Sequence, residues 1–409
     1  MVTGGPPPAA DVPSTGEEVL EALLETEHHL APSEIASVIE RLGRAIGAGQ
    51  VTAYLVDHAQ SVLSVLPGST AAEEELDIDG TVAGRAFQTE LIANGPPVGG
   101  ARLCWVPIVD GADRLGVLRA VVSADPVTLR RVSALASIVA SMVVGRNQYG
   151  DDILLARRRR PMTLEAEMRW SMLPPLTYDG AGVSVAGVLE PAYEIAGDTF
   201  DYGVNGSATH LAILDAMGHG LQASVMVSLA VSSYRHSRRA GLDLDEMVAA
   251  MDRAVSSQFP EDCFVTAQLA VLDTEVGHLR YVSAGHPPPM LVRNGRVIGD
   301  LAVEQAPPVG LGLQVPKICD TWLEPGDRVL FLSDGAIEAR SPEGELFGRD
   351  RLGGLLERAV SSGLPSAEVM RRLMHALLAH QQSALQDDAT LVLLGWPDGA
   401  VPTEPLDRG

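Results

Sequence analysis

The chain has 409 residues, of which 46% are hydrophobic and 20% charged, and its 53 acidic against 30 basic side chains give a net charge of −23. This length predicts two or three domains of about 150 residues each, and the composition is that of a globular chain, which excludes disorder throughout. The negative charge repels nucleic-acid phosphates and anionic lipids, so we expect neither nucleic-acid nor membrane binding, whereas it suits the capture of divalent cations.

Cysteine usage and the terminal segments indicate a cytoplasmic protein. Cys104, Cys263 and Cys319 are odd in number and far apart, so neither a disulfide framework nor a thiolate zinc site is predicted. The longest nearly apolar stretch, residues 132–144, is shorter than the roughly 18–20 residues that cross a bilayer. Residues 1–16 lack the basic and apolar regions of a signal peptide and, like residues 398–409, are predicted to be a flexible tail.

Residues 17–147 are predicted to form a mixed α/β domain. Apolar residues at helical spacing indicate a helix over residues 35–46, and Asp125 followed by Pro126 is typical of the start of a second helix. Short runs of β-branched and aliphatic residues predict four strands, the last two joined by a hairpin at Asp110-Gly111: residues 51–56, 61–66, 104–109 and 114–122.

The order of helix, hairpin, loop, hairpin and helix resembles a GAF domain, most clearly in the stretch VPIVDGADRLGVL at residues 106–118. The resemblance implies one of two roles: a module for dimerisation and packing with an empty pocket, or a sensor of a small molecule. No His or Cys in the sequence stands at an obvious attachment point for haem or bilin, so the ligand of such a sensor stays open.

Residues 148–173 are predicted to be a helical linker. Leu164, Met168 and Met172 repeat every four residues and form an apolar stripe suited to pairing with another helix. The helix ends before Pro174-Pro175, which cannot continue it. We therefore expect a homodimer formed through the GAF-like domain and this helix.

Residues 174–397 are predicted to form antiparallel sheets with helices packed outside, which makes the fold class α+β. Strands follow one another in the sequence, and Asn294-Gly295 indicates a hairpin, unlike the strict alternation of strand and helix in a parallel sheet. The sequence has no GxGxxG after a strand and no GxxxxGK[ST], so dinucleotide and P-loop sites are not expected. The predicted strands are 183–191, 210–218, 264–273, 279–285, 290–298, 328–335 and 389–396, and the predicted helices are 221–240, 244–258, 349–361 and 366–382.

Acidic residues stand at the ends of four strands in this domain. Asp198 follows the first strand, and Asp215 and Asp334 end two apolar strands. Asp387 and Asp388 immediately precede the last strand. One such acid is usually a turn former or a helix cap, but several that converge would repel one another unless a cation neutralised them.

Oxygen ligands without a Cys or His cluster select hard cations, Mg²⁺ or Mn²⁺. Two such ions close together activate a water molecule and offset charge on a phosphoryl group during in-line attack. Convergence of the acids would therefore predict hydrolysis of a phosphate ester.

Five motifs occur in this part of the chain in a fixed order: AGDTFDY, LDAMGHG, SAGHPPP, LSDGAIEAR and QDDATLVLL. Together they resemble the PPM (protein phosphatase 2C-type) serine/threonine phosphatases, most closely the bacterial SpoIIE/RsbU branch, from about Met172 to Gly395. The resemblance implies an αββα sandwich of two antiparallel sheets flanked by helices. It also implies a protein-serine/threonine phosphatase that uses two Mn²⁺ or Mg²⁺ ions.

The resemblance implies a role for each matching acid. Asp215 would bridge both metals, and the main-chain carbonyl of Ala216 would complete the shell of one. Asp334 and Asp387 would hold the other metal. Asp198 would act through a metal-bound water.

Two further positions follow from the same motifs. Asp388 is a candidate metal residue that would stand behind its neighbour Asp387, the safer ligand of the pair. Ala196 stands where the family usually has Gly. The sequence offers no clear counterpart of the Arg that holds phosphate in eukaryotic relatives, which would leave the phosphate to the metals.

His219, in a GHG turn, is a candidate acid that protonates the leaving Ser or Thr oxygen, because an imidazole suits proton transfer near neutrality. Alternatively, it is a structural residue in a turn set by the flanking glycines. The usual substrate in this branch is a phosphorylated STAS-type anti-anti-sigma factor, which implies a partner-switching pathway that controls a sigma factor. An inactive partner-binding scaffold and a small-molecule phosphohydrolase stay open as other functions.

Overall fold

The computed structural model describes residues 31–397, apart from 73, 112, 124, 181, 195–196, 305, 313–315 and 383–386. The predicted tails at 1–16 and 398–409 and the position of Ala196 lie outside the described residues. The chain divides into two compact units, here called the N-terminal unit (Met1–Asp110 and Arg114–Arg158) and the C-terminal unit (Gly111–Asp113 and Arg159–Gly409).

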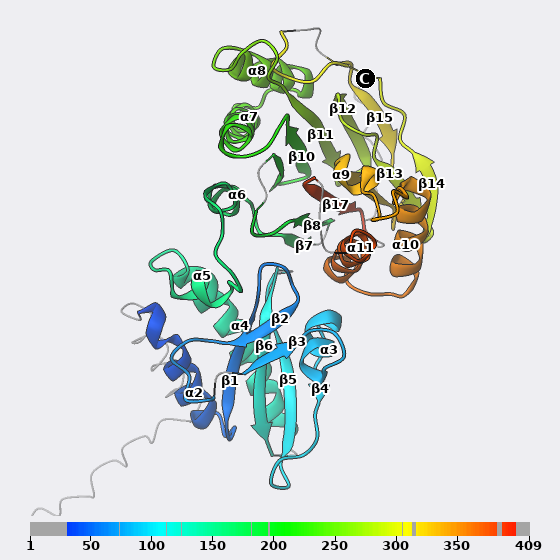
Figure 1. Cartoon of the computed structure of the whole chain (residues 1–409). Coiled ribbons are helices and arrows are strands. Elements are labelled where there is room, and N and C mark those ends of the chain that lie inside the picture. Colours follow the sequence, from blue (N-terminus) through cyan, green and yellow to red (C-terminus); the bar gives the residue numbers. More distant parts are fainter. Residues whose placement is uncertain are drawn as a thin grey trace, which may run out of the picture. The chain divides into compact units, whose positions relative to one another are not determined.

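An antiparallel sheet of six strands forms the centre of the N-terminal unit, in the order β3-β2-β1-β6-β5-β4 (Figure 1). The four predicted strands are confirmed, whereas β3 and β4 are too short for a period of two residues to be recognised in the sequence. The strands are β1 (Val51–Val56), β2 (Val62–Val65), β3 (Glu75–Asp77), β4 (Ala93–Asn94), β5 (Arg102–Asp110) and β6 (Asp113–Val122).

Helices cover both faces of this sheet. Ile39 of α2 and Val139 of α4 belong to the core on one face, and Phe87 of α3 packs with Tyr54 in the core on the other. Asp125 starts α4 as predicted, since its carboxylate accepts a hydrogen bond from the N–H of Val127 at 3.0 Å. The helices are η1 (Pro32–Glu34), α2 (Ile35–Ala45), α3 (Val82–Thr89), α4 (Pro126–Arg146) and α5 (Asp152–Ala156).

Within the described residues, α4 is the one helix that is long and apolar enough to span a membrane by length and composition. Its residues Val132, Leu135 and Val139 are buried in the core of the N-terminal unit. A core helix passes the same test of length and composition, so the finding is weak evidence for a membrane span.

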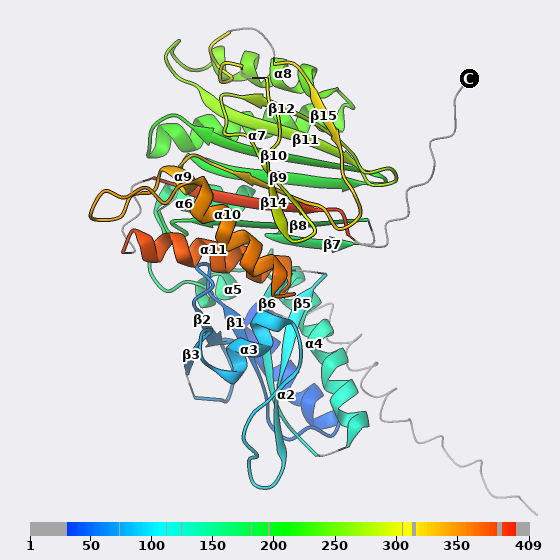
Figure 2. The same ribbon diagram turned by 90° about the vertical axis from the view of Figure 1, so that its right-hand side faces the viewer.

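Two antiparallel sheets face each other in the C-terminal unit (Figure 2). The five-stranded sheet has the order β15-β12-β11-β10-β9, and the six-stranded sheet has the order β14-β13-β16-β17-β8-β7. Phe200, Phe331 and Trp396 belong to the core between them. The strands are β7 (Thr177–Gly180), β8 (Val183–Glu190), β9 (Asp198–Asn205), β10 (Ala208–Ala216), β11 (Val265–Asp273), β12 (His278–Ala284), β13 (Met290–Arg293), β14 (Arg296–Asp300), β15 (Cys319–Trp322), β16 (Arg328–Leu332) and β17 (Ala389–Gly395).

Helices α7 and α8 cover the outer face of the five-stranded sheet, and α10 and α11 cover the outer face of the six-stranded sheet (Figures 1 and 2). Met226 and Met247 are buried on the first face, and Leu356 and Leu373 on the second. The predicted arrangement of antiparallel sheets flanked by helices is therefore present in this unit. Its helices are α6 (Leu164–Met172), α7 (Leu221–Arg239), α8 (Leu244–Ser256), α9 (Gly335–Glu338), α10 (Arg349–Ser361) and α11 (Ser366–His380).

The sequence analysis did not predict β9. Asp198 does follow β8, as predicted, but it also begins a further strand. Asp198 is the first residue of β9, which pairs along its whole length with β10. The segment DTFDYGVN combines strand formers (Thr, Phe, Tyr and Val) with two acids, a Gly and an Asn, so its local preference is mixed. Pairing with the neighbouring apolar strand decides between these preferences.

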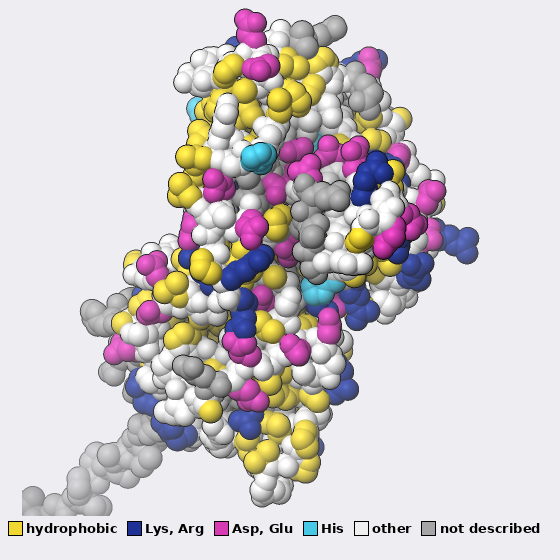
Figure 3. Space-filling model, in the orientation of Figure 1, with side chains coloured by type: hydrophobic (Ala, Val, Ile, Leu, Met, Phe, Trp, Pro, Cys, Tyr) yellow, Lys and Arg dark blue, Asp and Glu magenta, His cyan; other side chains and the backbone are white. Residues whose placement is uncertain are grey.

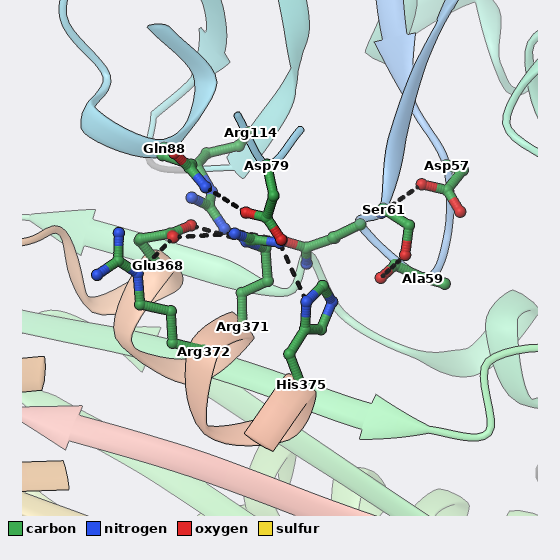
Figure 4. Close-up of polar contacts among 11 residues, drawn as sticks. Asp57, Ala59, Ser61, Asp79, Gln88, Arg114, Glu368, Arg371, Arg372 and His375 are labelled. Carbon is green, nitrogen blue, oxygen red and sulfur yellow. Dashed lines mark hydrogen bonds and ion pairs between the residues drawn. The ribbon is translucent and has the colours of Figure 1, made fainter. Parts of the chain in front are cut away.

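Charged residues are linked along α11 of the C-terminal unit (Figure 4). Glu368 accepts hydrogen bonds from the Nε atoms of Arg371 and Arg372, both at 2.9 Å. Pairs three and four residues apart lie on one face of a helix, so these contacts support its first two turns.

Candidate metal centre

Five carboxylates from strand ends of both sheets come together in the C-terminal unit. Asp198 and Asp215 face each other as register partners on β9 and β10. Asp334 follows β16, while Asp387 and Asp388 precede β17, and these two strands are antiparallel neighbours. The end of one is therefore beside the start of the other, so the acids of the six-stranded sheet gather at one edge.

Two hydrogen bonds tie the acids of one sheet to the other sheet. The Asp388 carboxylate, beside β17, accepts from the N–H of Gly197 at 2.7 Å, just before β9. Ser333 at the end of β16 donates its hydroxyl to Asp198 Oδ2 at 2.6 Å. Residues more than 130 positions apart are thereby held at one place.

Two glycines allow this close approach. A Cβ atom on Gly335 would lie 1.9 Å from the carbonyl oxygen of Asp388. A Cβ atom on Gly197 would lie 2.8 Å from the carbonyl oxygen of Ala216 and 3.2 Å from Asp215 Oδ1. Any side chain at either position would push an acid-bearing segment away from its neighbour.

The gathered acids disfavour one another's ionised forms. Burial, and then the charges of Asp215 and Asp388, raise the pKa of Asp198 well above its usual range. Burial, and then the charges of Asp334 and Asp387, raise the pKa of Asp215 to about 7. Burial also raises the pKa of Asp387, with a further contribution from the charge of Asp334. The cluster thus carries more negative charge than its surroundings neutralise.

The donor chemistry of the cluster fits hard cations. The side-chain atoms that it offers are carboxylate oxygens, and a cation would relieve the repulsion that, after burial, raises their pKa values. Within the described ranges, no three or more His, Cys, Asp or Glu side chains form a group that could hold a metal ion. Any ion held here would therefore need water or main-chain oxygens to complete its shell.

Asp215 interacts with acids of both sheets. It faces Asp198 across the β9–β10 pair, and Asp334 and Asp387 act on it electrostatically from the other sheet. Ala216 follows it at the end of β10, where its N–H donates to the carbonyl of Gly197 at 3.2 Å. The carbonyl of Ala216 thus lies beside the same segment.

His219 lies in the loop between β10 and α7 and is exposed. Gly218 and Gly220 on either side have φ angles of +88° and +77°, which L-residues rarely adopt. The two glycines therefore set the turn that presents His219 to solvent three residues beyond the end of β10. In the view of Figure 3, acidic side chains gather beside an exposed His on one face of the C-terminal unit.

Three residues at the cluster were not singled out from the sequence. Ser333 bonds Asp198, and Glu338 contributes to the raised pKa of Asp387. Both lie inside the motif LSDGAIEAR, so the motif itself held the signal. Arg169 on α6 is fully buried, and the charges of Asp198 and Asp388 raise its pKa against the larger lowering by burial. Nothing in its local sequence pattern distinguishes it from a surface arginine.

The metal-free protein should lose stability as the pH rises. Because the folded-state pKa of Asp215 is raised from about 3.9 to about 7, its stabilising contribution is complete below pH 4 and is lost as the pH passes 7. We expect the thermal midpoint in chelator to be lower at pH 8 than at pH 5.5, by the equivalent of about 2 kcal/mol or more. Differential scanning calorimetry of the wild type and Asp215→Asn measures this. A variant with the same pH dependence as the wild type would contradict the assignment of the repulsion to Asp215.

Comparison with known proteins places this geometry in a family. Residues 205–397 match the family described as Stage II sporulation protein E (SpoIIE). Over 235 residues the chain is 25% identical to phosphoserine phosphatase RsbU of Bacillus subtilis (strain 168), covering 56% of this chain and 68% of RsbU. Over 231 residues it is 24% identical to phosphoserine phosphatase RsbP of the same organism, covering 55% of this chain and 54% of RsbP.

A solved structure of the RsbU and RsbW domains of Rv1364c from Mycobacterium tuberculosis is 29% identical, with a TM-score of 0.47, and the match covers 55% of this chain and 62% of that chain. The chain thus spans less than two thirds of RsbP and of this solved chain. Residues 205–397 are a SpoIIE domain, that is, a phosphatase domain of the PP2C type, in a chain related to the phosphoserine phosphatases RsbU and RsbP.

Proposed function

We propose that this protein removes phosphate from phosphoserine or phosphothreonine of a regulatory protein, in a reaction that depends on Mn²⁺ or Mg²⁺. The observation that carries the proposal is the meeting of five carboxylates at the edges of two sheets, where burial and then the charges of its neighbours raise the pKa of Asp215 to about 7. Such a cluster is costly without cations and suited to hold them. The relationship to RsbU and RsbP agrees with this reading.

The residues would divide the work by position. Asp215 would hold both ions. The carbonyl of Ala216 would complete the shell of one ion, and Asp334 and Asp387 would hold the other. When bound, the ions would lower the pKa of a water molecule and offset charge on the phosphoryl oxygens. Asp198, fixed by its hydrogen bond from Ser333, would orient that water.

Asp388 completes the site by its position. Its carboxylate accepts from the N–H groups of Gly197 at 2.7 Å and Asp198 at 3.4 Å. We assign it to holding this segment in place and do not assign it to an ion. It would thereby keep Asp198 opposite Asp215.

Replacement of Asp215 or Asp334 by Asn should lower Mn²⁺-dependent turnover of a phosphorylated STAS-domain protein by about 100-fold or more, because each change removes a charge that the reaction requires. Phosphate release measures the rate. The matched control is Asp179→Asn, an exposed acid on β7 that should leave the rate unchanged.

Two outcomes of the same assay favour other functions. Binding of the phosphoprotein without any turnover by the wild type would favour a partner-binding scaffold. Turnover of small phosphate esters alone would favour a small-molecule phosphohydrolase, since the same two-ion chemistry serves both substrates.

His219 is proposed to protonate the leaving oxygen of the serine or threonine. Its exposed position between two glycines leaves the ring accessible to a bound substrate. His219→Asn should lower kcat on a phosphopeptide about 100-fold, the lower range for a general acid. The rate on p-nitrophenyl phosphate should change little, because nitrophenolate leaves without protonation. Equal losses on the two substrates would assign His219 to the structure of the turn.

The part before the SpoIIE domain is proposed to regulate it. We assign residues 17–147 to a GAF-like sensor domain, 148–173 to a helical linker and 174–397 to the phosphatase domain, in a cytoplasmic homodimer that acts in partner switching on a sigma factor. The sheet of the N-terminal unit, with α2 and α4 on one face and α3 on the other, supports this reading. Leu164, the first residue of the predicted apolar stripe, is 60% exposed and so accessible to a second helix.

Deletion of residues 1–160 should convert a dimer to a monomer and change the rate on the phosphoprotein, because it removes the sensor domain and the segment before α6. Light scattering and the phosphate-release assay measure the two effects. An unchanged mass and an unchanged rate would contradict the regulatory role.

A further inference from the structure

Helix α6 is fastened to the part of the C-terminal unit that carries the acids. The indole Nε1 of Trp170 donates to the carbonyl of Ala192 at 2.7 Å, in the connection between β8 and β9. At the end of the helix, Arg235 of α7 donates to the carbonyl of Met172. These two contacts hold α6 against the β8–β9 connection and against α7, and therefore determine where Arg169 lies.

Arg169 is the charged residue of α6 that faces inward. It is fully buried, next to Trp170 in sequence and one turn from the buried Ala166. A buried guanidinium is costly unless acids compensate it. The acids whose charges favour its ionised form are Asp198 and Asp388. The helix thus buries a positive charge whose ionised form the charges of these two acids favour.

Asp388 connects Arg169 to the other acids, because it interacts electrostatically with Arg169 and also holds Gly197 by a hydrogen bond. Its carboxylate accepts from the N–H of Gly197, and Gly197 packs directly against Asp215 and Ala216. A shift of Asp388 would therefore move Gly197, which lies against Asp215 and Ala216.

We propose that Arg169 is a positioning residue, which holds the carboxylates of Asp388 and Asp198 in the arrangement that the metal ions require. The proposal rests on the proposed metal-dependent function of this cluster. Arg169 is buried, so it acts through these two acids and does not contact the substrate.

Arg169→Gln removes the charge and keeps a polar, though shorter, side chain. In chelator, we expect the thermal midpoint of the full chain to fall by about 5 °C or more, because two buried acids lose their counter-charge. In the Asp388→Asn background the same change should cost much less, because one of those acids is then neutral. Equal losses in both backgrounds would mean that Arg169 only fills space, and would overturn the proposal.

The affinity for Mn²⁺ distinguishes a positioning role of Arg169 from a purely electrostatic effect of its charge. Removal of a positive charge beside a negative cluster should tighten Mn²⁺ binding if nothing moves. Loss of positioning should instead weaken it about tenfold. Isothermal titration calorimetry with Mn²⁺ alone measures the Kd, and we expect weaker binding by Arg169→Gln and recovery of most of the affinity in Arg169→Lys. Tighter binding by Arg169→Gln would overturn the proposal.

The matched control is Arg239→Gln, an exposed arginine on α7, which should leave both measurements unchanged. If Arg169→Gln does not fold, a folded Arg169→Gln/Asp388→Asn double variant supports the pairing, and an unfolded one contradicts it. Neither measurement needs turnover. A wild type that binds Mn²⁺ but hydrolyses no phosphoester would refute the proposed function and leave the role of Arg169 to be decided by these data.

Discussion

Repulsion among carboxylates is the constraint on which the C-terminal unit depends. The fold brings Asp198 and Asp215 from one sheet against Asp334, Asp387 and Asp388 from the other, and each raised pKa in the group reflects burial followed by the charge of its neighbours. Hydrophobic packing between and outside the sheets supplies the free energy that holds the acids together. The chain concentrates an unfavourable interaction at one place, where a cation can relieve it.

Hydrogen-bond donors and one positive charge of the protein itself compensate part of the negative charge of the cluster. Ser333 donates to Asp198, the N–H of Gly197 donates to Asp388, and Arg169 brings a buried positive charge from the preceding helix. These partners lie at Asp198, which is buried, and at Asp388, which is half-buried. Asp334 is also half-buried, and Asp387 is exposed.

The elements of both units could be read from the sequence where the pattern was strong. Apolar runs such as ATLVLLGW and the Asp125-Pro126 helix start correspond closely to β17 and α4. The weakly patterned β9, the very short β3 and β4, and the four-residue α9 could not be read, because their structure depends on pairing with distant residues. Five ordered motifs pointed to the acids, and the same motifs contained Ser333 and Glu338 without marking their roles.

By itself, the sequence determined the kind of chemistry: acids at strand ends beside glycines, and no competing nucleotide or thiolate motif. The tertiary structure decided which of those acids meet, that Asp198 begins a strand, and that Arg169 of α6 is buried where the charges of Asp198 and Asp388 act on it. The physical reason is the distance along the chain over which each kind of interaction acts. Strand and helix preferences act over a few residues, whereas the contacts that join Ser333 to Asp198 and Asp388 to Gly197 cross more than 130 positions and exist only once two sheets have packed.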